Sequence, residues 1–413
     1  MGTVRILLIN HYAGTPARGM EFRPFYFARE WVRAGYEVEI LAASRSHVRA
    51  KNPRLNGPWM KETLEGVDYR WLWTPSYKGN GPGRILNMAA FIVWLFMLIP
   101  WAAWRRRPDL VIASSTYPLD MVPAWLMARL SGARLLFEVH DLWPLSPMEL
   151  GGMSARHPFI LLMKWGENFA YRHCDTCVSL LPAALAHMTA HGLSPEKFHY
   201  VPNGVDLEEW GSEREPLGDR HRDALASLRA RRGLLVGFLG THGLANALHT
   251  FLQAAVRLHG ESVGFVLIGG GPDKEQLMTE ANRLGLGDSV LFLPPVGKRQ
   301  VPSALAELDV LYIGLQKQPL FRFGISPNKI FDYMMAGRPI INGIEAGNDP
   351  IAEAGCGRSV PSEDPDALAA AIRELAVMGS EEREDLGRRG RGFVESRHQI
   401  RNLAARMLER PGA

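Results

Sequence analysis

The chain has few cysteines and no large excess of charge of either sign. Only Cys174, Cys177 and Cys356 occur in 413 residues, so a disulfide framework is not expected and a reducing compartment fits. Lysine and arginine number 47 against 43 acidic residues, and a net charge of +4 gives no reason to expect a nucleic-acid partner. After Met1 and Gly2 an apolar run begins without a basic leader, so we expect no secretory signal peptide.

The length and the pattern of apolar runs predict two α/β domains. A chain of 413 residues is too long for one hydrophobic core. Runs such as Val4–Asn10 and Tyr36–Ala43, with a helical segment between them, are typical of parallel strands in a βαβ unit, and a second such unit starts at Leu234. Ligand sites in such folds lie beyond the carboxyl ends of the strands. We place the domains at residues 1–206 and 207–390, followed by a crossing helix at 391–413.

One long apolar segment interrupts the first domain. Residues 85–104 are uncharged, three arginines follow at 105–107, and the run is long enough to span a bilayer. The expected strands on either side, Glu37–Ala42 and Asp109–Ser114, should belong to one sheet, which a membrane crossing would forbid. We therefore interpret 85–107 as a helix in the membrane interface, with a fully buried helix as the alternative. Its interfacial anchors would be Trp94, Trp101 and Trp104.

Loops after the first-domain strands carry polar candidates. Gly14 and Gly19 follow the first strand, where a ligand would lie, although glycine is also the usual residue of a turn. His140 and Asp141 follow the strand expected at 134–140 and could act as acid, base or hydroxyl anchor. The alternative for His140 is an ordinary loop residue with satisfied hydrogen bonds.

The second domain repeats this arrangement. The strand from Leu234 leads to a loop in which Gly243 and the Thr241 hydroxyl could approach a phosphate. The triplet Gly269–Gly271 follows another strand but lacks the spacing of a dinucleotide fingerprint, so NAD is not expected. Residues 290–298 could bind a base through their backbone.

The stretch 321–341 is the strongest candidate for a nucleotide site. Ser326 is a favourable N-cap residue and Gly337 a natural helix stop, so a helix is expected between them. Its first turn would present amide groups and Lys329 to a phosphate, with the Asp332 carboxylate one turn later for a pair of hydroxyls. A nucleotide diphosphate-sugar has both groups.

No residue pattern indicates a metal. Cys174 and Cys177 have redox spacing but lie where a strand begins, so we interpret both as packing residues. His173 beside them lacks a second ligand pair with suitable spacing. Asp364 and Asp366 resemble a metal-binding pair but fit better as caps of a following helix.

Several motifs in fixed order resemble family 4 of the glycosyltransferases. They are Arg18–Arg23, Asp141–Pro144, Val201–Asp206, Gly269–Pro272 and Ser326–Gly337. The resemblance covers essentially the whole chain and is nearest to bacterial fucosaminyltransferase-like enzymes of O-antigen and capsule assembly. It implies the GT-B fold: two Rossmann-like domains whose parallel sheets face a central cleft, with a C-terminal helix that crosses back to the first domain. It also implies retention of the anomeric configuration.

The resemblance also assigns residues. Gly19 would approach the donor pyrophosphate and Asp332 would bind the nucleotide ribose. The first glutamate of the family's Glu-x7-Glu motif falls on Gly324, and the family's arginine and lysine are absent from residues 241–246. The full donor-binding set is Gly19, Gly240, Thr241, Gly243, Lys298, Ser326, Asn328 and Asp332. The catalytic set is Arg23, His140, Asp141, Arg322 and Lys329.

The expected reaction follows from this resemblance. A sugar, such as an N-acetylated deoxyhexosamine, would move from a UDP-sugar to a lipid-linked saccharide acceptor, without an obligatory cofactor or metal. Lys329 and Arg322 would stabilise the leaving diphosphate, while Arg23 and Asp141 would face the acceptor and sugar. The protein would be cytoplasmic and bound to the inner face of the cytoplasmic membrane. The alternatives are a nucleotide-sugar epimerase of the same architecture and, because of Gly324, a non-catalytic membrane-associated nucleotide-sugar binder.

Overall fold

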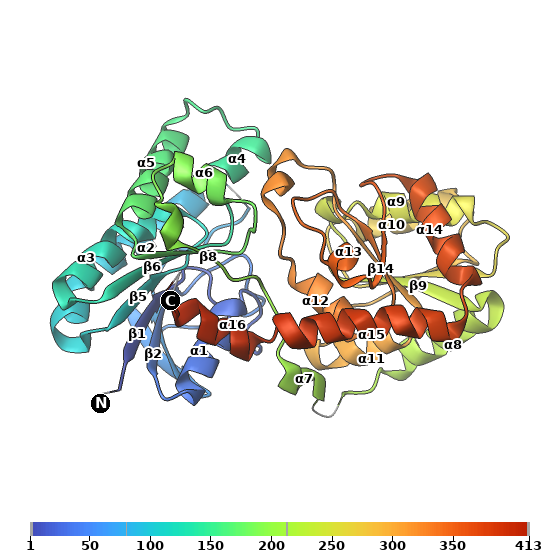
Figure 1. The fold of residues 1–413 in the computed structure, drawn as a ribbon, viewed down its shortest axis with the longest axis horizontal. Coiled ribbons are helices and arrows are strands. Elements are labelled where there is room, and N and C mark those ends of the chain that lie inside the picture. Colours follow the sequence, from blue (N-terminus) through green and yellow to red (C-terminus); the bar gives the residue numbers. More distant parts are fainter. Residues whose placement is uncertain (1–2, 80, 212–213, 411–413) are drawn as a thin grey trace. The chain divides into compact units, whose positions relative to one another are not determined.

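A computed structural model describes residues 3–79, 81–211 and 214–410 and divides the chain into two compact units. The N-terminal unit runs to Asn203 and takes in Phe323–Ile325 and the residues from Ile400 onward. The C-terminal unit comprises Gly204–Arg322 and Ser326–Gln399. Each unit has its own sheet covered by helices (Figure 1), which confirms the predicted class of two α/β domains.

The sheet of the N-terminal unit is parallel except at one edge. Its strands are β1 (Arg5–Ile9), β2 (Glu37–Ala43), β3 (Trp59–Leu64), β4 (Val67–Leu72), β5 (Leu110–Ala113), β6 (Arg134–Val139), β7 (Thr176–Ser179) and β8 (Phe198–Tyr200). They lie in the order β3-β4-β2-β1-β5-β6-β7-β8, and only the β3/β4 pair is antiparallel. Sequence analysis missed this hairpin, whose turn residues Glu65 and Gly66 both have positive φ, as tight hairpin turns require.

Helices cover both faces of this sheet. They are α1 (Arg23–Arg33), α2 (Pro82–Met97), α3 (Met121–Ser131), α4 (Leu145–Glu149), α5 (Pro158–His173), α6 (Leu185–Ala190) and α16 (Ile400–Leu408), with short helices η1 (Trp101–Arg106), η2 (Pro118–Asp120) and η3 (Pro195–Lys197). Successive β1 residues alternate between two cores: Leu7 and Ile9 face α2, α3, α5 and α6, whereas Ile6 and Leu8 face α1 and α16. Trp31 of α1 donates to the Ala404 carbonyl of α16 at 2.8 Å.

The apolar segment folds as α2 and η1 on this unit. β2 and β5, the strands expected before and after it, belong to one sheet, as predicted. Trp94 donates to the Trp73 carbonyl at 2.8 Å, and the Arg70 guanidinium lies 4.1 Å from the Trp101 ring centroid, so two of the three expected anchors pack onto the protein. Trp104 is exposed. Within the described residues no helix has both the length and the apolar character that a membrane crossing requires.

The C-terminal unit has an all-parallel, doubly wound sheet. Its strands are β9 (Leu234–Leu239), β10 (Val263–Ile268), β11 (Val290–Leu293), β12 (Val310–Gly314), β13 (Ile340–Gly343) and β14 (Gly357–Ser359). Their order is β11-β10-β9-β12-β13-β14, so the connection reverses direction between β9 and β12. In such sheets ligands bind outside the carboxyl ends of the strands at this switch point.

The helices of this unit correct two predictions. They are α7 (Leu207–Gly211), α8 (Asp219–Arg232), α9 (Leu248–Arg257), α10 (Lys274–Arg283), α11 (Val301–Ala306), α12 (Asn328–Met335), α13 (Pro350–Ala354), α14 (Pro365–Val377) and α15 (Ser380–Arg397), with short helices η4 (Leu244–Asn246), η5 (Lys298–Gln300) and η6 (Pro319–Phe323). The N-cap of α12 is Pro327, whose extended conformation moves the helix start beyond Ser326. In place of the single crossing helix expected at 391–413, the described residues form two helices, α15 and α16, separated at 398–399.

Two packing predictions are confirmed. The Asp364 carboxylate accepts from the amides of Asp366 and Ala367 at 3.0 and 2.9 Å, so it caps α14. Cys174 and Cys177 are free, fully buried and part of the apolar core of the N-terminal unit.

Candidate functional site

The carboxyl end of β9 is held by the turn that follows β10. The amides of Gly240 and His242 donate to the carbonyls of Ile268 and Gly270 at 3.0 and 2.8 Å. A Cβ on Gly269 would lie 1.9 Å from the Gly240 oxygen, so only glycine permits this approach. The glycine triplet therefore acts in packing, and it fixes the backbone of the loop where a phosphate is expected.

Lys329 lies against this loop from the first turn of α12. Its Nζ is 3.0 Å from Asn246 Oδ1 and 4.1 Å from the centroid of the Phe238 ring. A Cβ on Gly240 would come within 2.7 Å of Lys329 Cε, so the lysine stem runs directly beneath the end of β9. Burial lowers the Lys329 pKa to about 7. Within the described chain this ammonium makes no ion pair, so an anionic ligand would supply the missing counter-charge.

Two further predicted residues meet beside α12. Lys298 Nζ lies 3.8 Å from Asp332 Oδ2 and 3.9 Å from Glu209 Oε2. The Tyr333 hydroxyl exchanges hydrogen bonds with the backbone of Leu239 at the end of β9, at 2.7 and 3.0 Å. These hydrogen bonds connect α12 to β9, and Lys329 and Asp332 both lie near the switch point.

The remaining predicted residues of this unit are less closely gathered. Thr241 is exposed, and its carbonyl accepts from Asn246 Nδ2 at 3.0 Å. Gly243 caps η4, while Ser326 and Asn328 are half-buried next to the start of α12. Arg322 is exposed on η6 and donates to the Pro319 carbonyl at 2.6 Å. Contacts of these five residues with a donor stay predictions.

Gly324 has φ of +100° and is buried. A glutamate at this position would have to adopt a backbone conformation that costs a side-chain-bearing residue free energy. The missing acid is therefore accompanied by a local backbone conformation that favours glycine.

In the N-terminal unit the predicted residue Arg23 is fully engaged by protein. Its Nε lies 2.8 Å from Glu138 Oε1, and its other nitrogens donate to the carbonyls of Val201 and Pro202 and to Asn203 Oδ1 at 2.6–3.2 Å. Only 3% of its side chain is exposed. The Arg23 guanidinium is therefore occupied by protein contacts, and a role of Arg23 towards the sugar stays a prediction.

Glu138 in turn positions His140. Glu138 Oε2 lies 3.2 Å from His140 Nε2 and accepts from the Ser114 hydroxyl at 2.5 Å. Burial alone would raise the Glu138 pKa, but the charges of Arg23 and His140 hold it well below its usual range. Burial alone would lower the His140 pKa, but the Glu138 carboxylate raises it above its ordinary value. The result is a buried charge network at the carboxyl ends of β5 and β6 that favours a protonated His140.

The other first-domain candidates differ in their surroundings. Asp141, next to His140, is exposed. A Cβ on Gly14 would lie 1.9 Å from the Gly19 oxygen, and Gly19 itself has φ of +97°. Gly14 therefore serves the turn, which was the alternative interpretation. An approach of Gly19 to a donor stays a prediction.

Sequence analysis missed several residues of these sites. Asn10 follows β1 and donates from Nδ2 to the Ser114 carbonyl at 2.6 Å; both are polar residues at strand ends, a signal that could have identified them. Glu138 is a charged residue inside an apolar strand, and this pattern could have identified it. Asn246 carried no sequence signal. His242 is fully buried, and neither ring nitrogen has a hydrogen-bond partner in the part of the chain that the structure describes; burial, then Lys274 and Lys329, lower its pKa to about 4.

Known families match both halves of the chain. The model of the glycosyl transferase 4-like domain matches residues 18–204, and that of glycosyl transferases group 1 matches residues 233–377. WcaI of Escherichia coli K12, a glycosyl transferase assigned to colanic acid biosynthesis, is 23% identical over 360 residues, which cover 84% of this chain and 86% of WcaI. D-inositol 3-phosphate glycosyltransferase of Streptomyces coelicolor is 27% identical over 391 residues, which cover 89% and 81%.

Solved structures show the same fold. The Escherichia coli trehalose-6-phosphate structure bound with UDP-2-fluoro glucose matches with a TM-score of 0.72 at 13% identity, over 97% of both chains. At that identity the likeness concerns the fold. Together with the two family matches, it identifies the chain as a glycosyltransferase of the GT-B fold, built from a glycosyl transferase 4-like domain followed by a glycosyl transferases group 1 domain.

Proposed function

We propose that this glycosyltransferase moves a sugar, with retention of configuration, from a UDP-sugar to a lipid-linked saccharide in bacterial surface polysaccharide synthesis. The observation that carries the donor assignment is Lys329, a half-buried lysine without an ion-pair partner in the described chain, whose pKa burial lowers to about 7, at the switch point of a doubly wound sheet. A diphosphate placed there gains a charge-assisted hydrogen bond and restores the charged state of the lysine.

The chemistry needs mainly charge stabilisation. As the bond from sugar to diphosphate breaks, negative charge grows on the leaving oxygen, and a fixed cation lowers the barrier without reorganisation. Lys329 supplies that cation, and Asp332, one helical turn later, is placed to accept from ribose hydroxyls. In this scheme Lys298 orients Asp332, from which it is 3.8 Å away.

We assign the hydroxyl-anchoring role in the N-terminal unit to His140. The Glu138 carboxylate raises the His140 pKa above its ordinary value, which favours the protonated, hydrogen-bond-donating imidazole. Exposed Asp141 is the acceptor available beside it. Such a pair can hold sugar hydroxyls in a defined orientation, which supports transfer through proximity.

The choice of donor and of subgroup rests on similarity to other proteins. The UDP-2-fluoro glucose in the structural relative supports a UDP-linked donor, and the assignment of WcaI to colanic acid biosynthesis supports a polysaccharide product. The sugar we favour is an N-acetylated deoxyhexosamine, as in the fucosaminyltransferase-like subgroup. Thermal-shift screening of nucleotide sugars tests this, because a ligand raises stability with the logarithm of its concentration over its Kd. Equal shifts for UDP-glucose and UDP-N-acetylfucosamine would contradict the choice of sugar.

A membrane-bound acceptor is supported by one surface of the N-terminal unit. On α2 and η1, Leu86, Val93, Met97 and Trp104 are 57–64% exposed, and Arg105 and Arg107 beside them are exposed as well. Apolar side chains next to cations fit an anionic bilayer surface.

Vesicle flotation tests the membrane assignment. We expect Met97→Gln with Trp104→Gln to release the protein from phosphatidylglycerol vesicles, since both side chains are exposed, unlike Trp94 and Trp101. Val377→Gln, an equally apolar exposed site on the C-terminal unit at 85% exposure, is the control. Retained binding of the double variant would overturn this part of the proposal.

A second candidate is a non-catalytic nucleotide-sugar binder, favoured by Gly324 in place of the expected glutamate. Product analysis of the purified protein separates the candidates. The transferase requires UDP-sugar and lipid acceptor together, an epimerase changes the donor alone, and a binder leaves both unchanged.

A further inference from the structure

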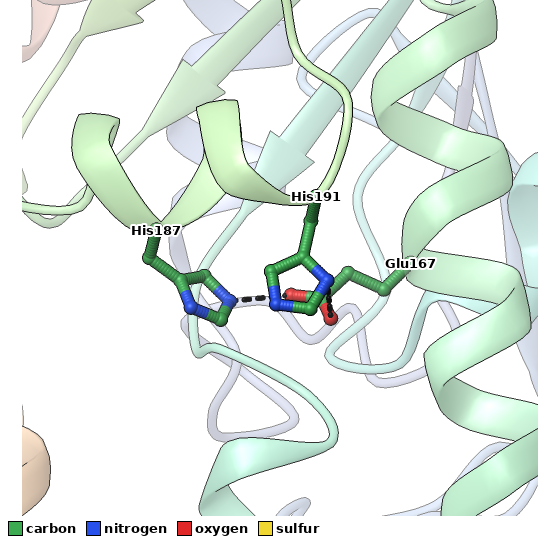
Figure 2. A group of neighbouring side chains, drawn as sticks. All are labelled: Glu167, His187 and His191. Carbon is green, nitrogen blue, oxygen red and sulfur yellow. Dashed lines mark hydrogen bonds and ion pairs between the residues drawn. The ribbon is translucent and has the colours of Figure 1, made fainter.

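Three potential ligand side chains gather on the N-terminal unit away from the residues described above. Figure 2 shows the imidazoles of His187 and His191, both from the α6 segment, beside the carboxylate of Glu167 from α5. His187 Nε2 lies 2.8 Å from Glu167 Oε1, and His191 Nδ1 lies 3.7 Å from Oε2. The candidate ligand atoms of all three lie within 4.8 Å of one another. None of them belongs to the charge network of Arg23, Glu138 and His140.

The carboxylate is not fully satisfied by protein. Glu167 is 2% exposed, and its Oε1 receives hydrogen bonds from His187 and, at 3.3 Å, from the Tyr171 hydroxyl. Its Oε2 is buried and has no hydrogen-bond partner among the residues the structure describes. A buried carboxylate oxygen left in this state costs free energy, and a cation placed between the three side chains would remove that cost.

The surroundings resemble those of a metal-ligating set. The two histidines are spaced i, i+4, with His187 within α6 and His191 at its C-cap, and their rings lie 4.4 Å apart between centroids. His191 Nδ1 is 2.9 Å from Asn168 Oδ1, a contact that orients the ring and, with the proton on Nδ1, leaves Nε2 as the ligand atom. The Phe323 ring packs against His187 with centroids 5.4 Å apart. The side chains of His187 and His191 are 12% and 23% exposed, so an ion could enter from solvent.

We propose that Glu167, His187 and His191 bind one divalent transition-metal ion, with Zn²⁺ the best match to the ligands. Two imidazoles and one carboxylate are a set that Zn²⁺ accepts in tetrahedral geometry, and the fourth position is left to water. Small side-chain movements bring three atoms this close together to the roughly 2.0–2.2 Å that Zn²⁺ requires.

The ion would have a structural role: it would link two helices of the N-terminal unit and take no part in sugar transfer. It would tie α6 to α5, and the segment just before α6 holds Phe323 through the bond from the Ala183 amide to the Phe323 carbonyl at 3.0 Å. Residues 323–325 belong to this unit. Only Ser326 and Pro327 separate them from α12, the helix that carries Lys329, so the metal would fix the starting point of that stretch of chain.

Metal titration of the full-length protein tests the proposal. After treatment with a chelator, calorimetry should show one Zn²⁺ bound per chain, and Co²⁺ should give a visible absorption band of a low-coordinate nitrogen–oxygen site. Glu167→Gln, His187→Gln and His191→Gln should each weaken binding by more than about 100-fold, since loss even of outer partners typically costs 10- to 100-fold. His173→Gln is the control: this exposed histidine lies on α5 outside the cluster and should leave affinity unchanged.

Two melting measurements distinguish loss of metal binding from loss of the fold. In chelator, Glu167→Gln should melt no lower than the parent protein, because it removes a poorly satisfied buried charge. Added Zn²⁺ should raise the melting temperature of the parent and of His173→Gln but not of Glu167→Gln. Absence of binding at one equivalent, or the same affinity in the parent and all three ligand variants, would show the cluster to be an ion pair only and would overturn the proposal.

Discussion

Buried Arg23 and half-buried Lys329 are both cations beneath the carboxyl ends of parallel strands, but their surroundings are opposite. Arg23 has a carboxylate at 2.8 Å and three further oxygen acceptors. Lys329 has one amide oxygen and the face of a phenyl ring, and burial brings its pKa to about 7. The protein thus supplies a counter-charge to Arg23, whereas it supplies none to Lys329 within the described residues. A fully paired buried charge supports the fold, whereas an unpaired one indicates where a ligand of opposite charge binds.

The largest expected effect is on stability, through Arg23. Arg23→Met removes the guanidinium from the buried Glu138 carboxylate and leaves it only His140 and the Ser114 hydroxyl, which should cost about 3–5 kcal/mol of unfolding free energy and lower the first melting transition by roughly 10 °C. Arg18→Met, which breaks the partly exposed pair with Glu62, should cost at most about 1 kcal/mol. Differential scanning calorimetry compares the two. Equal losses would contradict the claim that Arg23 is the structural cation.

Lys329→Met should give the converse result. Turnover should fall by about 100-fold, corresponding to roughly 3 kcal/mol of lost charge stabilisation, while the melting temperature stays the same or rises because no amine has to be buried. The control is Lys317→Met, an exposed lysine paired with Glu345. Steady-state transfer with saturating donor is the measurement, and unchanged kcat would remove Lys329 from the mechanism.

The pH dependence distinguishes the two cations in a third way. With a pKa of about 7, Lys329 in the free protein is mostly neutral at pH 8, so donor binding should take up a proton and donor affinity should fall, at most about tenfold per pH unit, as pH rises above 7. The unfolded chain binds the additional proton between about pH 7 and 10.4, so this group makes stability rise with pH over that window. Calorimetry in buffers of different ionisation enthalpy measures the uptake; Lys329→Met should abolish it.

The smallest expected effect concerns the space beneath β9. Gly240→Ala places a Cβ 2.7 Å from Lys329 Cε and should displace the ammonium, which we expect to cost about tenfold in kcat/KM, or 1.4 kcal/mol. Gly287→Ala, whose new Cβ meets no atom within 4 Å and which lies outside the predicted site, is the matched control. If both variants behave alike, the position of Lys329 is not what limits the reaction.

The sequence predicted the fold better than the site. Apolar runs that end in polar residues marked most strands, because both faces of a parallel sheet are covered. The β3/β4 hairpin was missed because β3 is a partly exposed edge strand that contains Lys61 and Glu62. Lys329 was predicted from a helix start, although that start was placed too early. Its partner Asn246 and the orientation of Arg23 depend on tertiary contacts between distant residues, which no local pattern reveals.

The place of α16 has a consequence for biosynthesis. Ile400, Leu403, Ala404 and Met407 complete a core whose other members come from the first 201 residues, and Trp31 is bonded to Ala404. A ribosome makes α16 only after residues 204–399, so the unit that emerges first has an uncovered apolar face throughout synthesis of the other. Any nascent chain that stops before residue 400 therefore presents that face to chaperones.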